Sequence, residues 1–279
     1  MANRYCVLGY PLGHTMSPPI HRRLFELAGI EAEYLTREIP PEELPRAVPE
    51  LLALSGFNIT IPHKLAIMPF LGSLSEEARR YGAVNCVKCG GIATGYNTDV
   101  IGFTRSVEAL GATLDGRVAV LGCGGAGRMM AIEAALRGAS VTLAVRPSGL
   151  DRAQGVRDDV LRNKPGADVA VTTLDRLTGG FDLLVNATPV GMYPHGDASP
   201  VPEETLDGVS HMFDAIYNPV ETPLMRAARA RGIPAAGGMA MLVWQAAAAH
   251  ELWDGSRYAQ ADIEALTADM ERQVAATFR

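Results

Sequence analysis

The sequence predicts a two-domain α/β protein, and three observations carry that prediction. Strand-like and helix-like segments alternate along most of the chain, which is typical of α/β architecture. A glycine-rich turn, Gly122-x-Gly124-x-x-Gly127, lies between an apolar run ending at Leu121 and a helical segment beginning at Arg128. More than 100 residues precede this turn, which is too many for a tail. We therefore expect one domain to be built before a dinucleotide-binding domain begins.

The first hundred residues contain apolar runs bounded by glycine or proline, and these runs indicate strands. Proline near a start and glycine after an end mark helices, and Gly90-Gly91 between two runs indicates a hairpin. The predicted strands are Tyr5–Leu8, Glu33–Ile39, Gly56–Thr60, Val84–Cys89 and Ile92–Tyr96. The predicted helices are Pro19–Ala28, a helix from Pro40 to about Leu54, and a helix from about Val100 to Leu110.

The later part of the chain continues the alternation, with a short β-branched run before each new polar segment. The predicted strands are 118–121, Ser140–Val145, Asp168–Thr173, Asp182–Asn186 and His211–Ala215, and the predicted helices are 128–136, Met239–Leu252 and 259–276. We expect the last two helices to return to the first domain. Residues 1–101 and 238–279 are then expected to form a substrate-binding domain. Residues 102–237 are expected to form a dinucleotide-binding domain of Rossmann type. The cleft between two such domains is a usual place for a small-molecule site.

The glycine turn has the features that bind a diphosphate. Gly122 allows a tight turn, Gly124 allows a phosphate to approach the backbone, and Gly127 allows the helix to pack on the strand. The first N–H groups of the following helix lack intrahelical partners, and the helix dipole adds positive charge there. The strand before the turn and the helix after it supply the context that this motif requires, so we expect a dinucleotide here.

Arg146 predicts which dinucleotide is bound. An NAD-binding domain usually places an acidic residue after its second strand to hold the ribose 2′-hydroxyl. The sequence has no acidic residue between Glu133 and Asp151, and Arg146 follows that strand instead. A guanidinium can hold a 2′-phosphate through charge-assisted hydrogen bonds. We therefore expect NADP(H) as the cofactor, with a solvated loop arginine as the alternative.

Composition and charge exclude several classes of partner. The net charge is −6, from 25 basic and 31 acidic residues, which gives no electrostatic footprint for nucleic acid. No run of about 18 apolar residues occurs, so we expect no membrane span. The four cysteines include one Cys-x-x-Cys, Cys86 and Cys89, without a second pair, so we expect no metal. The few cysteines and the absence of a signal-peptide pattern indicate a cytoplasmic protein.

Three polar clusters stand at predicted strand or helix ends and are candidates for the chemistry. The segment 14–18, which begins with His14, includes Thr15 and Ser17 and lies directly before a helix, where its hydroxyls suit a carboxylate or simply cap that helix. The second cluster, 58–64, ends in Lys64 just after the strand Gly56–Thr60. The third cluster, 97–99, ends in Asp99 just after the hairpin. If Lys64 and Asp99 meet, the carboxylate orients the ammonium for proton transfer; a surface ion pair, or no contact, is the alternative.

Eight segments form a pattern that extends beyond the glycine turn: 9–18, 58–64, 82–85, 97–99, 122–127, 186–192, 214–219 and 237–245. Taken together, these segments resemble the shikimate dehydrogenase family. They occur in family order and extend over most of the chain. The resemblance implies NADPH-dependent, reversible reduction of 3-dehydroshikimate to shikimate, a step of chorismate and aromatic amino acid biosynthesis.

The resemblance also implies roles for individual residues. Lys64 matches the catalytic lysine and Asp99 its partner. The residues that match substrate-binding positions are Thr15, Ser17, Thr60, Asn85, Tyr217 and Gln245. Those that match cofactor-binding positions are Gly122, Gly124, Gly125, Ala126, Gly127, Arg146, Asn186, Thr188, Met192 and Gly237. The small-molecule substrate is the expected partner, and the assembly, a monomer or a homodimer, stays open.

Two positions depart from the family pattern. Thr15 stands where serine is common, which adds a methyl group beside the expected carboxylate site. Val145-Arg146-Pro147 replaces the common Asn-Arg-Thr at the 2′-phosphate. A relative acting on quinate or amino-shikimate is therefore an alternative, as is a catalytically silent NADP-binding sensor module. Such a module is expected to have lost Lys64 or Asp99, and both are present.

Overall fold

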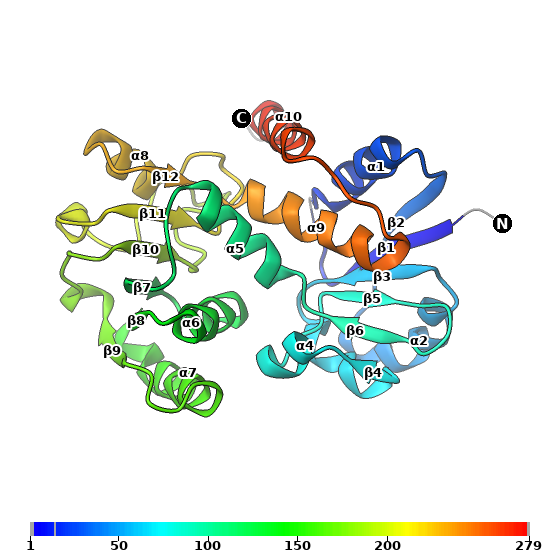
Figure 1. Cartoon of the computed structure of the whole chain (residues 1–279), viewed down its shortest axis with the longest axis horizontal. Helices are drawn as coiled ribbons and strands as arrows, with labels where there is room; N and C mark the ends of the chain where they lie inside the picture. Colours follow the sequence, from blue (N-terminus) through cyan, green and yellow to red (C-terminus); the bar gives the residue numbers. More distant parts are fainter. Residues whose placement is uncertain (1–2, 14, 278–279) are drawn as a thin grey trace. The chain divides into compact units, whose positions relative to one another are not determined.

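The computed structural model describes residues 3–13 and 15–277 and divides into two compact units. The described residues up to Gly102 form the first unit together with Leu242–Met270. Phe103–Met241 form the second unit together with the described residues from Glu271 onward. The second unit is thus inserted in sequence between two parts of the first (Figure 1). His14 of the first polar cluster lies outside the described residues.

The first unit contains a six-stranded sheet in the order β2-β1-β3-β5-β6-β4. Strands β1, β2 and β3 are parallel, whereas β5 runs antiparallel to both of its neighbours. The strands are β1 (Asn3–Gly9), β2 (Ala32–Glu38), β3 (Gly56–Ile59), β4 (Ser73–Leu74), β5 (Cys86–Lys88) and β6 (Thr94–Tyr96). The helices within residues 3–102 are α1 (Ser17–Ala28), η1 (Pro41–Glu43), α2 (Leu44–Leu52), α3 (His63–Ala66), η2 (Met68–Phe70) and α4 (Glu76–Tyr81). A boundary between the two units falls inside each of three helices, α5 (Asp99–Ala109), α9 (Met239–Asp254) and α10 (Gln260–Thr277).

Strand β1 shows how this sheet is covered on both faces. Cys6 and Leu8 belong to a buried cluster with the apolar side of α2, whereas Tyr5, on the opposite face, belongs to one with Trp253 of α9. The indole N–H of Trp253 donates to the backbone oxygen of Val87, 2.9 Å away. The prediction that the C-terminal part of the chain returns to the first sheet is therefore confirmed.

A buried pair of histidines lies in the layer formed by α1 and α9. His21 Nδ1 and His250 Nε2 are 3.0 Å apart, and His250 Nδ1 is 2.8 Å from the hydroxyl of Tyr258. That hydroxyl donates to the backbone oxygen of Leu24, so it must accept from His250 Nδ1–H. His250 Nε2 then accepts from His21 Nδ1–H, which leaves His21 Nε2 as a buried acceptor with no hydrogen-bond partner among residues 3–13 and 15–277. This network assigns both rings the neutral form.

We predict that this pair makes the protein less stable in acid. Burial lowers the pKa of His250 from 6.5 to about 4, partly offset by Asp254, and burial followed by the charge of His250 also lowers the pKa of His21. The folded state favours the neutral imidazoles, and this contribution to the free energy of unfolding is fully present above pH 6.5, the pKa of histidine in the unfolded chain. The contribution is lost as the pH falls towards 4, the pKa of His250 in the folded protein. Each unit of pKa shift corresponds to about 1.4 kcal/mol. For His250 alone, the free energy of unfolding should therefore fall by about 3 kcal/mol.

Urea unfolding between pH 7.5 and pH 4 measures this loss, and His250→Phe is the matched variant. Phenylalanine keeps an aromatic ring beside Phe25 and Trp253 but cannot be protonated, so the unfolding free energy of the variant should fall less over this interval. The same fall in both proteins would contradict the assignment of the pH dependence to His250.

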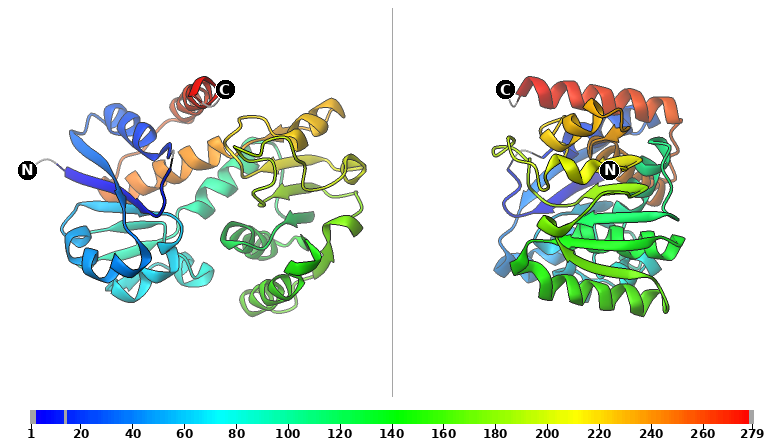
Figure 2. Two further views of the ribbon diagram at one scale, coloured as in Figure 1. Left: turned by 180° about the vertical axis from the view of Figure 1, so that it is seen from behind. Right: turned by 90° about the vertical axis from the view of Figure 1, so that its left-hand side faces the viewer.

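The second unit contains a parallel six-stranded sheet in the order β12-β11-β10-β7-β8-β9 (Figure 2). This is the strand order of the Rossmann fold, so that prediction is confirmed. The order reverses between β7 and β10, and ligands of such sheets bind beyond the carboxyl ends of the strands at this point. The strands are β7 (Arg117–Leu121), β8 (Ser140–Val145), β9 (Val169–Thr173), β10 (Leu183–Asn186), β11 (His211–Asp214) and β12 (Ala235–Ala236). The remaining helices are α6 (Gly125–Arg137), η3 (Pro147–Gly149), α7 (Leu150–Asn163), η4 (Leu174–Arg176), η5 (Glu203–Leu206) and α8 (Pro223–Ala230).

One predicted helix is wrong in its extent. The segment from Pro40 to Leu54 is a 3₁₀ turn, η1, followed by the shorter helix α2. Pro45 lies in the first turn of α2, where its missing N–H costs no intrahelical hydrogen bond. No helix within the described part of the chain is long and apolar enough to cross a lipid bilayer.

Candidate active site

Lys64 and Asp99 meet in the first unit. Lys64 lies in α3, which follows β3, and Asp99 is the first residue of α5. The ammonium Nζ is 2.6 Å from Asp99 Oδ2, and the two side chains are 31% and 21% exposed. The alternative that these residues do not meet is therefore wrong. The pair is partly shielded from solvent while the ammonium keeps access to a ligand, which suits proton transfer.

Asn85 joins this pair to helix α9. Its side-chain Nδ2 is 2.8 Å from Asp99 Oδ1, 3.0 Å from Thr98 Oγ1 and 3.3 Å from Gln245 Oε1. Its Oδ1 accepts from the backbone N–H of Thr98 at 2.7 Å. Asn85 and Gln245 are both buried. Three segments that are far apart in sequence therefore supply one hydrogen-bonded cluster.

The hairpin of β5 and β6 explains why these residues meet. Asn85 directly precedes β5, and its backbone N–H donates to the oxygen of Tyr96 at the end of β6. The residues after β6, which end in Asp99, therefore lie beside Asn85. The backbone N–H of Val84 donates to the oxygen of Lys64 at 2.8 Å and brings α3 to the same place.

Thr15, Ser17 and Thr60 lie at the carboxyl ends of β1 and β3. Ser17 begins α1, and its backbone N–H donates to Thr15 Oγ1 at 3.2 Å. Thr60 follows β3, and its N–H donates to the backbone oxygen of Leu8. A Cβ on Gly9 would press against Thr60 Cγ2, so the exit of β1 approaches Thr60 closely. Thr15, Ser17 and Thr60 are all half-buried.

The glycine turn of the second unit has the shape that its sequence predicts. Gly122 follows β7 with a φ of 94°, a conformation that favours glycine. A Cβ on Gly127 would overlap the backbone oxygen of Gly122, whereas Cβ atoms on Gly124 and Gly125 would lie in open space. Helix α6 begins at Gly125, so its first N–H groups face this exposed turn. Ala126 is also exposed.

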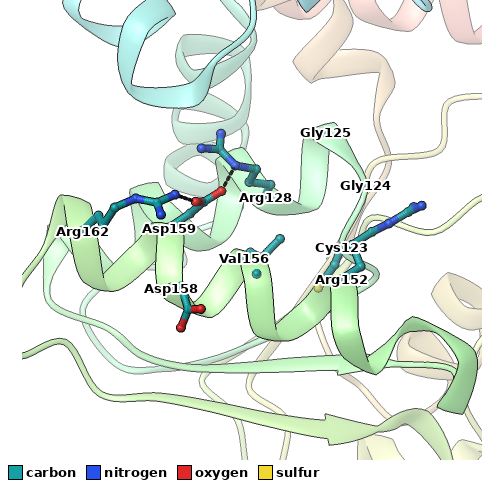
Figure 3. A pocket seen from close by; sticks show the side chains of 10 residues that line it. Cys123, Gly124, Gly125, Arg128, Arg152, Val156, Asp158, Asp159 and Arg162 are labelled. Atoms are coloured by element: carbon teal, nitrogen blue, oxygen red, sulfur yellow. Dashed lines mark hydrogen bonds and ion pairs between the residues drawn. The ribbon is translucent and has the colours of Figure 1, made fainter.

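A pocket of about 600 Å³ adjoins the turn (Figure 3). Arg128 of α6 pairs with Asp159 of α7, and Arg162 pairs with the same carboxylate from within α7. Arg152, in the first turn of α7, extends instead past Cys123 (Figure 3). Burial raises the pKa of Cys123 to about 11, with the charge of Arg152 opposing the shift. The thiol is therefore neutral at pH 7, and the arginine adds positive charge beside the turn.

The other residues predicted for the cofactor lie at the carboxyl ends of the strands or on the loops that follow them. Arg146 follows β8 and is exposed. Asn186 ends β10 and is buried, whereas Thr188 is half-buried and Met192 is 45% exposed. Gly237 precedes α9. Asn186 and Thr188 are therefore joined by direct hydrogen bonds, whereas Arg146 and Met192 are exposed to solvent.

Tyr217, predicted on the substrate side, belongs to the second unit. It follows β11 and is half-buried. Burial raises the pKa of its phenol, so the hydroxyl stays protonated at neutral pH.

Three residues without a role predicted from sequence stand out by their contacts. Thr98 holds the side chain of Asn85, Arg152 lies beside the glycine turn, and Asp214 is a fully buried carboxylate. A basic residue in the first turn of a helix after the second Rossmann strand could have indicated Arg152. Thr98 and Asp214 stand within quoted motifs, but only their tertiary contacts reveal what they do.

A Rossmann sheet with this glycine turn, joined to a second α/β unit that carries a Lys–Asp pair, places the chain in a definite class. It is a two-domain dinucleotide-binding α/β protein. Comparison with known proteins narrows the class to one family.

The family model described as "Shikimate dehydrogenase substrate binding domain" matches residues 7–87. A relative from Geobacter sp. (strain M21), named shikimate dehydrogenase (NADP(+)), is 38% identical over 260 residues, which are 90% of this chain and 89% of the relative. The chain belongs to the shikimate dehydrogenase family.

Solved structures agree in fold. A crystal structure of shikimate dehydrogenase in complex with NADP+ has a TM-score of 0.89 and 32% identity, and the match covers 96% of each chain. The Thermus thermophilus enzyme in complex with NADP(H) and shikimate has a TM-score of 0.86 and 34% identity, covering 96% of this chain and 99% of that one.

Proposed function

We propose that this protein is an NADP-dependent shikimate dehydrogenase, which catalyses the reversible reduction of 3-dehydroshikimate to shikimate. The observation that carries the proposal is the cluster of Lys64, Asp99 and Asn85, whose side chains are linked at 2.6 Å and 2.8 Å. The relative from Geobacter carries this activity in its name, and the Thermus structure holds both NADP(H) and shikimate. Residues 1–101 with 238–279 are the proposed substrate domain, and 102–237 the proposed cofactor domain.

The residues of the second unit fit NADP(H). The exposed backbone at Gly124 and Gly125 leaves open the space that a Cβ would fill, which allows a phosphate to approach. Gly122, Ala126 and Gly127 complete the diphosphate turn. Arg146 is the proposed ligand of the 2′-phosphate. Asn186, Thr188, Met192 and Gly237 are proposed to form the nicotinamide side.

In the proposed mechanism, Lys64 moves the proton. When bound, NADPH supplies the hydride that adds to the ring carbonyl carbon of the substrate. The Lys64 ammonium donates a proton to the carbonyl oxygen, which becomes the product hydroxyl, and then regains a proton from solvent. Asp99 Oδ2 orients the ammonium, and Asn85 holds the other carboxylate oxygen. In the direction of oxidation, neutral Lys64 accepts the hydroxyl proton.

The remaining residues are proposed to bind the substrate. Thr15 and Ser17 lie at the start of α1, where hydroxyls and helix N–H groups suit the carboxylate. Thr60, Asn85, Gln245 and Tyr217 are the proposed partners of the ring hydroxyls. The amide groups of Asn85 and Gln245 are already fixed by hydrogen bonds, so they are prepared to recognise one arrangement of hydroxyls.

The first experiment is the initial rate of NADP+ reduction with shikimate. Quinate in place of shikimate, and NAD+ in place of NADP+, are the matched controls in the same assay. A clear rate with shikimate and NADP+ supports the proposal. A rate with quinate alone would assign the protein to a sister activity, with Thr15 as the position to examine, and NADP+ binding without any turnover would favour a sensor role.

We predict that Arg146→Gln lowers kcat/KM for NADP+ by about 10- to 100-fold, because one charge-assisted hydrogen bond contributes roughly 1.5–3 kcal/mol. The value for NAD+ should change less than about twofold, since NAD+ has no 2′-phosphate. Arg231→Gln is the control, because Arg231 is an exposed arginine of the same unit that pairs with Glu203. Equal efficiency of the wild type with both cofactors would contradict the role of Arg146.

We further propose a cytoplasmic location and a homodimeric assembly. All four cysteines are free and buried, which fits a reducing compartment. Strand β2 is an edge of the first sheet, where a second copy could pair. Light scattering of the purified chain measures the assembly, and a monomer at micromolar concentration would contradict the dimer.

A further inference from the structure

A buried carboxylate stands at the end of β11. Asp214 is fully buried, and its Oδ1 accepts from Asn186 Nδ2 and from the backbone N–H of Ile216, both at 3.0 Å. Its Oδ2 accepts from the hydroxyl of Thr222 at 2.7 Å. Burial raises the pKa of Asp214, and these hydrogen bonds oppose that shift. Because all three partners donate, the ionised carboxylate is the form that the surroundings accommodate.

On one side, this carboxylate fixes the loop that follows β10. The Asn186 side chain, held by Asp214, accepts through its Oδ1 from the backbone N–H of Thr188 at 3.0 Å and from the Thr188 hydroxyl at 2.8 Å. The Thr188 hydroxyl in turn accepts from the N–H of Val190 at 3.2 Å. A rotation of the Asn186 amide would therefore break the turn that carries Thr188.

On the other side, the carboxylate fixes the loop that follows β11. Thr222 closes this loop and caps α8, because its hydroxyl accepts from the N–H of Met225 at 3.2 Å. The backbone oxygen of Ile216 accepts from the N–H of Gly238 at 2.9 Å. A Cβ on Gly238 would overlap the oxygen of Ala215, so the approach is close. The start of α9 is thereby tied to the residues next to Asp214.

The two loops lie at the point where the strand order reverses. Strand β10 pairs with both β7 and β11, so the ends of these three strands are neighbours. A Cβ on Gly122, at the end of β7, would lie 2.8 Å from Thr188 Cγ2. The loop held by Asn186 therefore packs directly against the glycine turn.

We infer that Asp214 is a positioning residue for the nicotinamide half of the cofactor. It joins the loop that carries Asn186 and Thr188 to the one that leads to Gly237, and it keeps both in one arrangement. This inference rests on the proposed function, which assigns these residues to the nicotinamide side. The adenosine half, proposed to contact Arg146 beyond β8, lies outside the network. Loosening the network should therefore weaken binding of one half of the cofactor only.

The test compares two ligands by titration calorimetry on the full chain. NADP+ contains both halves, whereas 2′,5′-ADP contains only the phosphorylated adenosine half. Asp214→Ala leaves three buried donors without an acceptor and can prevent folding, so Thr222→Val is the principal variant. It removes one donor to Asp214 and the cap of α8, while it keeps the size of the side chain.

Thr222→Val should weaken NADP+ binding by about tenfold, or about 1.4 kcal/mol, and should change 2′,5′-ADP binding by less than about twofold. Thr222→Ser restores the hydroxyl and should recover NADP+ affinity. The matched control is Thr205→Val: Thr205 is equally buried in the same unit, and its hydroxyl has no hydrogen-bond partner among the described residues. This control should leave both affinities unchanged.

Two results would overturn the inference. A parallel loss of both ligands in Thr222→Val would show general loosening of the unit, and an unchanged NADP+ affinity would show that the network does not position the nicotinamide half. If the wild type binds neither ligand, the proposed cofactor fails and the inference fails with it. Binding of both ligands by the wild type, with parallel changes in the variant, would contradict the inference alone.

Discussion

Lys64→Ala should lower kcat for shikimate oxidation by about 10²- to 10⁴-fold, the usual contribution of a positioned acid–base group. KM for shikimate should change much less, because a proton-transfer group acts mainly in the transition state. Two contacts support this expectation. The Lys64 ammonium lies 2.6 Å from Asp99 Oδ2, and Asp99 Oδ1 accepts a hydrogen bond from Asn85. Removing the amine leaves that carboxylate in place but without a proton to direct.

Steady-state kinetics with NADP+ checks this prediction. Lys164→Ala is the control, because Lys164 is an exposed lysine at the end of α7. It should keep wild-type kcat and KM. If Lys64→Ala retained a kcat near that of the wild type, Lys64 would have no part in the proton transfer.

Gly127→Ala is expected to lower both the stability of the second unit and its affinity for NADP+. The added Cβ would overlap the backbone oxygen of Gly122, so either α6 or the end of β7 must move. Overpacking of this kind costs about 1–3 kcal/mol in the free energy of unfolding. Because the same shift displaces the first turn of α6, NADP+ affinity should fall at least about tenfold, by roughly 1.4 kcal/mol.

Urea unfolding and NADP+ titration measure the two effects. Gly155→Ala is the control for stability: Gly155 lies inside α7, and a Cβ there would meet no atom of the described residues within 4 Å, apart from the neighbouring backbone of the same helix. It should stabilise the protein by about 0.5–1 kcal/mol through helix propensity alone. A Gly127→Ala protein with wild-type stability would show that the helix and strand do not pack as closely as described.

The Rossmann unit could be predicted largely from sequence because its signals are local. The apolar run before Gly122, the glycine spacing and the helical segment after it define strand, turn and helix within about 20 residues. The polar helix α7 was missed, although Ala153, Val156 and Val160 have helical spacing on its buried side. Helix α8 also carried its signals, with Thr222 as the N-cap and proline after it.

The site in the first unit could be predicted only in part. The strand ends indicated Lys64 and Asp99 as candidates, but their contact depends on the β5–β6 pairing and on the hydrogen bond between Val84 and Lys64. Gln245 reaches Asn85 from 160 residues away in sequence. Pairing register and long-range return of a helix are tertiary properties, so no local pattern contains them.

The covering of the first sheet by α9 has a consequence for how the chain folds as it is synthesised. Trp253 of α9 contacts Gly56 and Val87 and covers the face of the sheet that carries Tyr5. During translation, that face stays uncovered until α9 leaves the ribosome. The inserted Rossmann unit, which is nearly continuous in sequence, can complete its sheet earlier. A nascent chain that ends before α9 would therefore expose the apolar face of the first sheet that holds Tyr5.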